Sequence, residues 1–213
     1  DGKGVYDVRR RLGQRLAREQ PSDGEIIVPV PDSGRAHALG YAEESGIPFV
    51  EGFMKNRYVG RTFIMPHQKL RDKGVKIKLN PIRSVIEGRK VVLIDDSMVR
   101  GTTMRRIVEM IRNAGATGVD VRIASPPIIS PCSLGIDMKQ HYEFIARGRS
   151  MEEIAKIIGA DSVGYLSVEG LINSIGMERD ALCTGCITGE YPSVVKGLQI
   201  NFNTKDAFTS IGV

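Results

Sequence analysis

The stretch VVLIDDSMVRGTTMRRIVEMIRNAGA, residues 91–116, decides how this sequence folds. Four apolar residues run into Asp95 and Asp96, which is the pattern of a buried strand that ends in two carboxylates. A turn with a glycine follows, and Thr102 and Thr103 open an apolar pattern with helical spacing. The first turn of a helix offers free N–H groups and a partial positive charge, so this turn is suited to cradle a phosphate.

The two adjacent acids indicate what accompanies that phosphate. Carboxylates do not bind phosphate directly, but Asp95 and Asp96 can accept hydrogen bonds from sugar hydroxyls or hold a divalent cation through water. A monophosphate cradle beside acceptors for vicinal hydroxyls describes a site for a ribose 5-phosphate. The alternative is a capped helix with two solvated aspartates, and it does not explain why both acids follow an apolar strand.

Strand and helix patterns alternate along the rest of the chain. Residues 25–30 form a short apolar run that ends in a Pro-Asp-Ser-Gly loop at 31–34, and residues 118–128 form another run. This alternation predicts an α/β fold with a mostly parallel, doubly wound sheet and flanking helices, in which ligands bind at the carboxyl ends of the strands. We expect further helices at 5–19, 35–46, 102–116, 150–160 and 166–176, and further strands at 47–53 and 89–96.

Composition narrows the class of ligand. The 213 residues are 41% hydrophobic, which suits one α/β domain, and no apolar run is long enough to span a membrane. The net charge of +5 favours a polyanionic small molecule or a nucleic acid, and eight basic residues gather between Lys55 and Lys78 against a lone Asp72. Only 6% of residues are aromatic and no recognition motif appears, which argues against nucleic acid.

Two stretches carry a resemblance to a known family. VVLIDDSMVRGTT, residues 91–103, resembles the phosphoribosylpyrophosphate-binding fingerprint of type I phosphoribosyltransferases. VPVPDSGRAHALGYAEESGIPFVEGFMKNRYVGRTFIMPHQ, residues 28–68, is similar to glutamine phosphoribosylpyrophosphate amidotransferases, as are GIDM at 135–138 and EGLINSIG at 169–176. The resemblance fades after about Pro192. It implies the phosphoribosyltransferase fold, and a reaction of phosphoribosylpyrophosphate with ammonia that gives 5-phosphoribosylamine and pyrophosphate at the start of purine synthesis.

The resemblance also implies a binding site with three parts. Asp32, Ser33 and Gly34 would hold the pyrophosphate in a loop that often contains a non-proline cis peptide. Ser33, Asp95 and Asp96 would be associated with Mg²⁺, and the two aspartates would also meet the ribose hydroxyls. The residues implied for the 5-phosphate are Ser97, Arg100, Gly101, Thr102 and Thr103.

The basic segment, residues 55–83, then gains a function as a mobile loop that closes over the substrate. Negative charge grows on the departing pyrophosphate while the sugar resembles an oxocarbenium ion, so cations on the leaving oxygens stabilise the transition state. Closure would also exclude water, which would otherwise hydrolyse the sugar. The candidate residues are Lys55, Arg57, Tyr58, Arg61 and Lys78.

Three cysteines are present, with Cys183 and Cys186 in a C-x-x-C pair and Cys132 far upstream. Some members of the resembled family carry a 4Fe–4S cluster on four cysteines, and three of those positions match these residues. The fourth ligand would lie before residue 1. A zinc site and three reduced thiols are the alternatives. The odd cysteine count and the lack of an apolar N-terminal signal favour a cytoplasmic protein.

We expect residues 1–180 to form the phosphoribosyltransferase domain and residues 181–213 a tail. The chain begins as a fragment would, so the glutaminase domain of the family is expected to precede it, and this chain alone would use only free ammonia. The family suggests a homotetramer inhibited by purine nucleotides. A phosphoribosylpyrophosphate-sensing regulator and a purine-base salvage enzyme of the same fold are the alternative functions. The histidines are expected to be surface residues: His37, His67 and His141.

Overall fold

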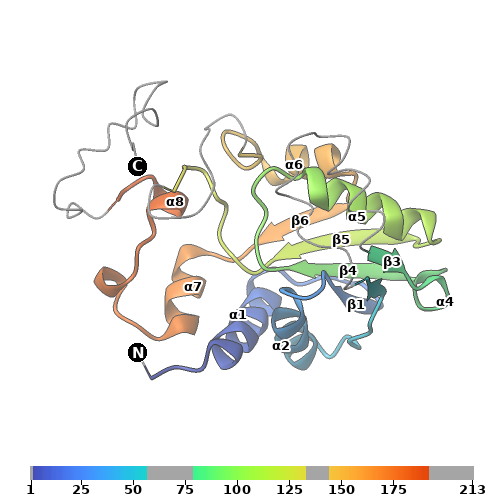
Figure 1. Ribbon diagram of the computed structural model, residues 1–213, viewed down its shortest axis with the longest axis horizontal. Helices are drawn as coiled ribbons and strands as arrows, with labels where there is room; N and C mark the ends of the chain where they lie inside the picture. The colour runs from blue at the N-terminus through green and yellow to red at the C-terminus, as the bar shows by residue number, and fades with distance from the viewer. Residues whose placement is uncertain (1, 57–78, 133–143, 192–213) are drawn as a thin grey trace.

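The computed structural model describes residues 2–56, 79–132 and 144–191. A four-stranded, fully parallel sheet in the order β1-β4-β5-β6 forms its centre, and helices cover both faces of the sheet (Figure 1). This architecture confirms the expected α/β fold with a parallel sheet. The strands are β1 (Ile26–Pro29), β4 (Lys90–Asp95), β5 (Gly118–Ile123) and β6 (Ser162–Tyr165).

The first helical layer consists of α1 (Val5–Glu19) and α2 (Arg35–Ser45), which pack against each other under one face of the sheet (Figure 1). Leu12 and Leu16 recur at helical spacing on α1 and are buried with Tyr41 of α2. This apolar stripe is what the sequence pattern of α1 predicts, and its burial holds the helix on the sheet.

The second layer covers the opposite face with α5 (Thr102–Asn113) and α6 (Met151–Ile158). Ile107, Ile111 and Ile154 are fully buried in the main core cluster. Alternate residues of β4 divide between the two layers: Val91 and Leu93 belong to the core under α5 and α6, whereas Val92 and Ile94 belong to the core under α1 and α2. A strand buried on both faces reads as the continuous apolar run seen in the sequence.

Two expectations about strands need correction. Residues 47–53 form no strand of the main sheet; only Phe49 makes an isolated bridge, to Ile27. Pro48 has no N–H to donate, and proline is disfavoured inside a sheet. Instead, β2 (Phe53–Lys55) pairs antiparallel with β3 (Leu79–Pro81) in a separate two-stranded sheet. The strand β6 was not expected, because its four residues include a glycine and carry little periodic signal.

The remaining helices are short. The expected capping box at Ser150 is confirmed: its hydroxyl accepts a hydrogen bond from the Glu153 N–H, and the Glu153 carboxylate accepts one from the Ser150 N–H. Within the described ranges, the helices are all too short or too polar to cross a bilayer. The other helical segments are α4 (Arg83–Ile86), α7 (Val168–Ile175), η3 (Arg179–Ala181) and α8 (Gly185–Thr188).

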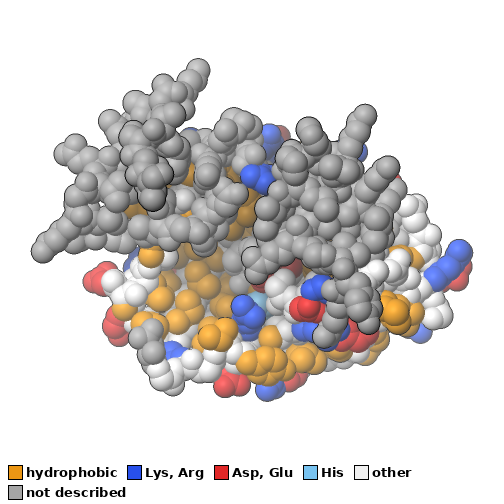
Figure 2. Space-filling view, in the orientation of Figure 1, with side chains coloured by type: hydrophobic (Ala, Val, Ile, Leu, Met, Phe, Trp, Pro, Cys, Tyr) orange, Lys and Arg blue, Asp and Glu red, His pale blue; other side chains and the backbone are white. Residues whose placement is uncertain are grey.

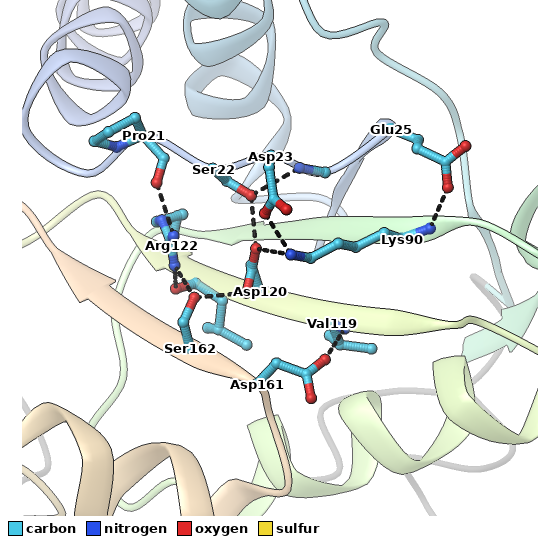
Figure 3. A network of polar contacts seen from close by, with 12 residues as sticks. Pro21, Ser22, Asp23, Glu25, Lys90, Val119, Asp120, Arg122, Asp161 and Ser162 are labelled. Carbon is cyan, nitrogen blue, oxygen red and sulfur yellow. Dashed lines mark hydrogen bonds and ion pairs between the residues drawn. The ribbon is translucent and has the colours of Figure 1, made fainter.

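A network of polar side chains links β5 to the segment that precedes β1 (Figure 3). Arg122 is 6% exposed and donates to the carbonyl oxygens of Gln20 and Pro21, at 2.9 Å each, and to the Ser162 hydroxyl at 2.8 Å. The buried Asp120 carboxylate accepts from that same Ser162 hydroxyl at 2.6 Å. The network therefore ties the chain between α1 and β1 to β5 and to the start of β6.

Charged side chains of both signs are interspersed over much of the described surface in Figure 2, and hydrophobic side chains gather over the region of α1 and α7. Two surface ion pairs join α1 to α2, Arg10 with Glu43 and Arg18 with Glu44, the latter at 2.7 Å. The basic side chains are therefore not gathered in a single patch on the described part of this face.

Candidate functional site

The two acidic loops meet at the carboxyl edge of the sheet. Strands β1 and β4 are parallel neighbours with Pro29 opposite Ile94, and the Val30 N–H donates to the Ile94 carbonyl at 2.8 Å. The turn at 31–34 and the acids that end β4 consequently emerge side by side. Their placement agrees with the rule that ligands bind at this edge, and the binding roles of the individual residues stay predictions.

Gly34 sets how closely the first turn approaches the sheet. A Cβ at this position would lie 2.5 Å from the Ile94 carbonyl oxygen and 2.8 Å from that of Val30, so only glycine fits without a backbone shift. The Gly34 N–H donates to the Val30 carbonyl at 2.9 Å, which closes the turn ahead of α2. The peptide bond between Pro31 and Asp32 is cis, as the family resemblance implies.

Lys55 joins the β2 strand to this turn. Its Nζ atom forms an ion pair with the Asp32 carboxylate, and the Lys55 side chain is 22% exposed. Lys55 is the single loop candidate that falls within the described part of the chain. The other candidates lie outside the described residues: Arg57, Tyr58, Arg61 and Lys78.

The acidic pair has an unusual electrostatic environment. Burial raises the pKa of Asp95 well above its ordinary value, and the negative charge of Asp96 raises it further, against the opposing effect of a hydrogen bond from the Asp96 N–H at 2.8 Å. The Ser97 hydroxyl reaches the Asp96 carboxylate at 3.4 Å. A bound cation, or the hydroxyls of a ligand, would relieve the cost of holding two carboxylates together in this position.

The turn that is predicted to hold a phosphate, residues 97–101, precedes α5. Gly101 is the N-cap residue with a φ of 72°, a left-handed conformation that favours glycine, and an added Cβ would collide with Ile145. No described side chain caps this helix, and no acid occupies its first turn. Thr102 and Thr103 are exposed there, next to the exposed Arg100. The amino terminus of α5 therefore has free N–H groups and exposed threonine hydroxyls, and it lies at the same edge of the sheet as Asp95 and Asp96.

The expectation that His37 is a surface residue is wrong. The side chain is 3% exposed on α2, and its Nδ1 atom lies 3.2 Å from the Ser33 carbonyl oxygen. Burial lowers the pKa of His37, while the charge of Asp96 acts in the opposite direction. Helical spacing in the sequence could have predicted this burial, since His37 precedes Tyr41 by four residues and both therefore lie on the same, buried face of α2. The other histidines, His67 and His141, lie outside the described residues.

The cysteines are brought near one another but not into a metal site. Cys132 and Cys186 pack, together with Val99, against a small apolar cluster formed by Ile128 and Phe144. Cys183 is exposed. Burial raises the pKa of the Cys186 thiol, and the neighbouring Cys132 and Cys183 raise it further. Across the described ranges, no three side chains of the ligand-forming types are placed to hold a metal ion. The described residues thus do not by themselves fit an iron–sulfur cluster or a zinc ion.

These features define a phosphoribosyltransferase, and comparison with known proteins agrees. The profile of the family described as "Phosphoribosyl transferase domain" matches residues 3–126, more than half of the chain, and the chain belongs to this family. The match contains both acidic loops and the turn before α5.

The most similar proteins among those compared indicate which kind of phosphoribosyltransferase this chain resembles. The chain is 57% identical over 195 residues to the amidophosphoribosyltransferase of Methanocaldococcus jannaschii, covering 92% of this chain and 41% of that protein. It is 52% identical over 199 residues to the Bacillus subtilis amidophosphoribosyltransferase, covering 92% of this chain and 42% of the relative. The chain therefore spans about two-fifths of the length of the curated relatives it matches.

A solved structure is similar over the same region. The glutamine phosphoribosylpyrophosphate amidotransferase from B. subtilis, in complex with ADP and GMP, superposes with a TM-score of 0.80 at 52% identity. The match covers 90% of this chain and 43% of that chain. At this level of identity the likeness extends beyond the shared fold to the amidotransferase branch of the family.

Proposed function

We propose that this chain is the phosphoribosyl-transferring part of an amidophosphoribosyltransferase. It would transfer ammonia to 5-phosphoribosyl 1-pyrophosphate, giving 5-phosphoribosylamine and pyrophosphate in purine synthesis. One observation carries the proposal: the turn that contains Ser33, the acids Asp95 and Asp96, and the uncapped start of α5 lie along one edge of the sheet. Pyrophosphate, ribose hydroxyls and 5-phosphate are the three groups such an edge would hold.

The proposed chemistry balances without a redox partner. The nitrogen lone pair of ammonia forms a bond to C1 of the ribose, the bond from C1 to the pyrophosphate oxygen breaks, and pyrophosphate leaves with that electron pair. The new ammonium group then loses a proton to solvent. Positive charge develops on the sugar and negative charge on the leaving group. Lys55 is the described cation beside the turn that would meet the leaving group, and it would stabilise this charge.

Mg²⁺ is the metal that we propose for this site. Asp95 and Asp96 would hold it together with Ser33, and the raised pKa of Asp95 supports this assignment, because a cation relieves the repulsion between the two carboxylates. When bound, the ion would neutralise part of the charge on the diphosphate. The residues of the chain orient the sugar and its phosphates around it.

The remaining features of the whole protein are also proposals. We propose that glutamine-derived ammonia comes from a glutaminase domain outside this chain, and that the assembled protein is a cytoplasmic tetramer regulated by purine nucleotides. A 4Fe–4S cluster would need a fourth thiolate from outside this chain to join the cysteines Cys132, Cys183 and Cys186. Iron analysis of the longest expressed protein, together with absorbance near 400 nm, tests this point.

Ammonia-dependent release of pyrophosphate with Mg²⁺ tests the proposed function. We expect Asp95→Asn and Asp96→Asn each to lower the rate by about 100-fold, because each removes charge that faces the reacting sugar. Asp180→Asn changes an exposed aspartate on η3 and should leave the rate unchanged. Equal rates in all four proteins would remove both acids from the site.

The same assay separates the alternatives. A salvage enzyme would release pyrophosphate with a purine base and not with ammonia. A regulator would bind phosphoribosylpyrophosphate without releasing pyrophosphate in either case. Hydrolysis of glutamine to glutamate by this chain without any added domain would contradict the assignment of that step to another part of the protein.

A further inference from the structure

His37 touches the turn that would hold the diphosphate, although no sequence pattern assigns it a role. It lies in the first turn of α2, and its Nδ1 atom is 3.2 Å from the carbonyl oxygen of Ser33, four residues earlier. The side chain is 3% exposed. A polar ring in such a position needs a specific partner, because an unpaired buried donor costs free energy.

The protonation of the ring follows from its partner. A carbonyl oxygen only accepts hydrogen bonds, so Nδ1 must carry the hydrogen and donate it to Ser33. With its hydrogen on Nδ1, the ring offers the turn one donor whose direction is fixed by the buried position of the side chain.

Few other contacts fix the same part of the turn. The Gly34 N–H donates to the Val30 carbonyl at 2.9 Å, which holds the end of the turn, and the Arg35 N–H reaches the Asp32 carbonyl only at 3.4 Å. Lys55 holds the Asp32 side chain. The hydrogen bond from His37 is therefore the described contact that orients the carbonyl of Ser33 and with it the peptide plane that follows.

We propose that His37 is a positioning residue: its Nδ1–H fixes the Ser33 carbonyl and so orients the 31–34 turn toward the diphosphate of the substrate. This inference deepens the proposed function and rests on it. The charge of Asp96 also acts on this ring. His37 acts through Ser33 and does not touch the reacting atoms, so its loss should weaken substrate binding more than it slows turnover.

Three variants at this position isolate the donor. His37→Asn keeps an amide N–H close to where Nδ1 lies, His37→Gln moves the donor outward to the place of Nε2, and His37→Leu keeps bulk without a donor. Ser174→Ala is the matched control, because the buried Ser174 hydroxyl also donates to a carbonyl four residues earlier, Gly170, at 2.7 Å. It lies in α7, which carries no candidate site residue.

The readouts are KM and kcat for phosphoribosylpyrophosphate in the ammonia assay, and calorimetric binding of inorganic pyrophosphate with Mg²⁺, which needs no turnover. We expect His37→Leu and His37→Gln to raise KM and the pyrophosphate Kd about five- to tenfold with kcat nearly unchanged, and His37→Asn to stay within twofold of the wild type. Ser174→Ala should lower the melting temperature and leave both constants unchanged.

Two results would overturn the inference. If His37→Leu binds pyrophosphate as tightly as the wild type, the hydrogen bond does not orient the turn. If His37→Asn weakens binding as much as His37→Leu, the ring fills space and its donor is irrelevant. If pyrophosphate binding depends on His37 but the wild type releases no pyrophosphate from phosphoribosylpyrophosphate, the proposed function is refuted and the positioning role stands. If the wild type does not bind pyrophosphate, the positioning role is refuted.

Discussion

Lys55 and Asp32 form an ion pair that connects two segments of the site, β2 and the turn after β1. The pair places an ammonium group at the turn where the family resemblance puts the pyrophosphate. It also balances the charge of Asp32 while the diphosphate is absent. A cation held in this way is already in place when charge develops on the leaving group, so little reorganisation is needed.

Lys55→Gln is therefore expected to lower kcat/KM for phosphoribosylpyrophosphate by about 100-fold, since in the proposed site this charge would face the departing oxygens. Pyrophosphate release with saturating ammonia measures the effect. Lys156→Gln, an exposed lysine in the last turn of α6, serves as the matched control and should retain full activity. A Lys55→Gln protein with activity within twofold of the wild type would show that this cation does not meet the leaving group.

Gly34→Ala should disturb the site through the backbone. The added Cβ would lie 2.5 Å from the Ile94 carbonyl oxygen, so the turn must move away from the sheet. We expect a loss of about 1–3 kcal/mol in the free energy of unfolding and a clear rise in KM. Gly46→Ala is the control: it imposes strain at a φ of 74°, meets no atom within 4 Å, and should lose stability without a change in KM. An unchanged KM in Gly34→Ala would contradict the close fit.

Arg122→Met tests the polar network around β5. The change leaves the carbonyls of Gln20 and Pro21 without their donor, while Asp120 keeps its ion pair with Lys90 at 3.5 Å. We expect the free energy of unfolding, measured in urea, to fall by about 1–3 kcal/mol, because buried acceptors lose their partner. Arg89→Met removes an exposed arginine that lies 3.8 Å from Glu25, and should change stability by less than about 0.5 kcal/mol. Similar losses of unfolding free energy in both variants would mean that the buried Arg122 contributes no more to stability than an exposed arginine.

Asp161 makes stability depend on pH. Burial by itself raises the pKa of Asp161, but hydrogen bonds from the Val119 N–H at 2.6 Å and from Arg112 at 2.8 Å outweigh it and lower the pKa. The ionised form is thus favoured in the folded state. Its contribution is complete above the ordinary pKa near 4 and is lost as the pH falls through the lower folded value.

Asp161→Asn is accordingly expected to cost about 1 kcal/mol of unfolding free energy at pH 7, a figure reduced for the exposure of the pair. The difference from the wild type should shrink as the pH is lowered below about 4. Urea denaturation at a series of pH values measures it, with Asp180→Asn as an exposed control. A difference that stays constant down to pH 2 would exclude the charge as its origin.

Local sequence patterns predicted the parts of the site that lie in one continuous segment. The strand β4, the acids that end it and the helix α5 follow one another within residues 90–113, so periodicity and turn chemistry were sufficient to predict them. The meeting of the two acidic loops also followed, because parallel strands bring their carboxyl ends to the same edge.

Contacts between distant segments could not be predicted in this way. The pairing of β2 with β3 joins residues that are more than twenty positions apart, and nothing in either segment specifies the other. The neighbourhood of Cys132 and Cys186 likewise depends on the path of the chain after β5. Such contacts are set by tertiary packing, which local propensity does not record.

The position of α1 has a practical consequence for truncation. This helix precedes the first strand, yet Leu12, Leu16 and Ala17 share one core with Tyr41 and Val92. A protein truncated to begin at β1 would expose to water the apolar side chains that α1 covers. The free energy of folding would lose about 1.5–3 kcal/mol for each large side chain exposed. A piece of this domain that folds autonomously is therefore expected to start upstream of the sheet and to include the buried residues of α1.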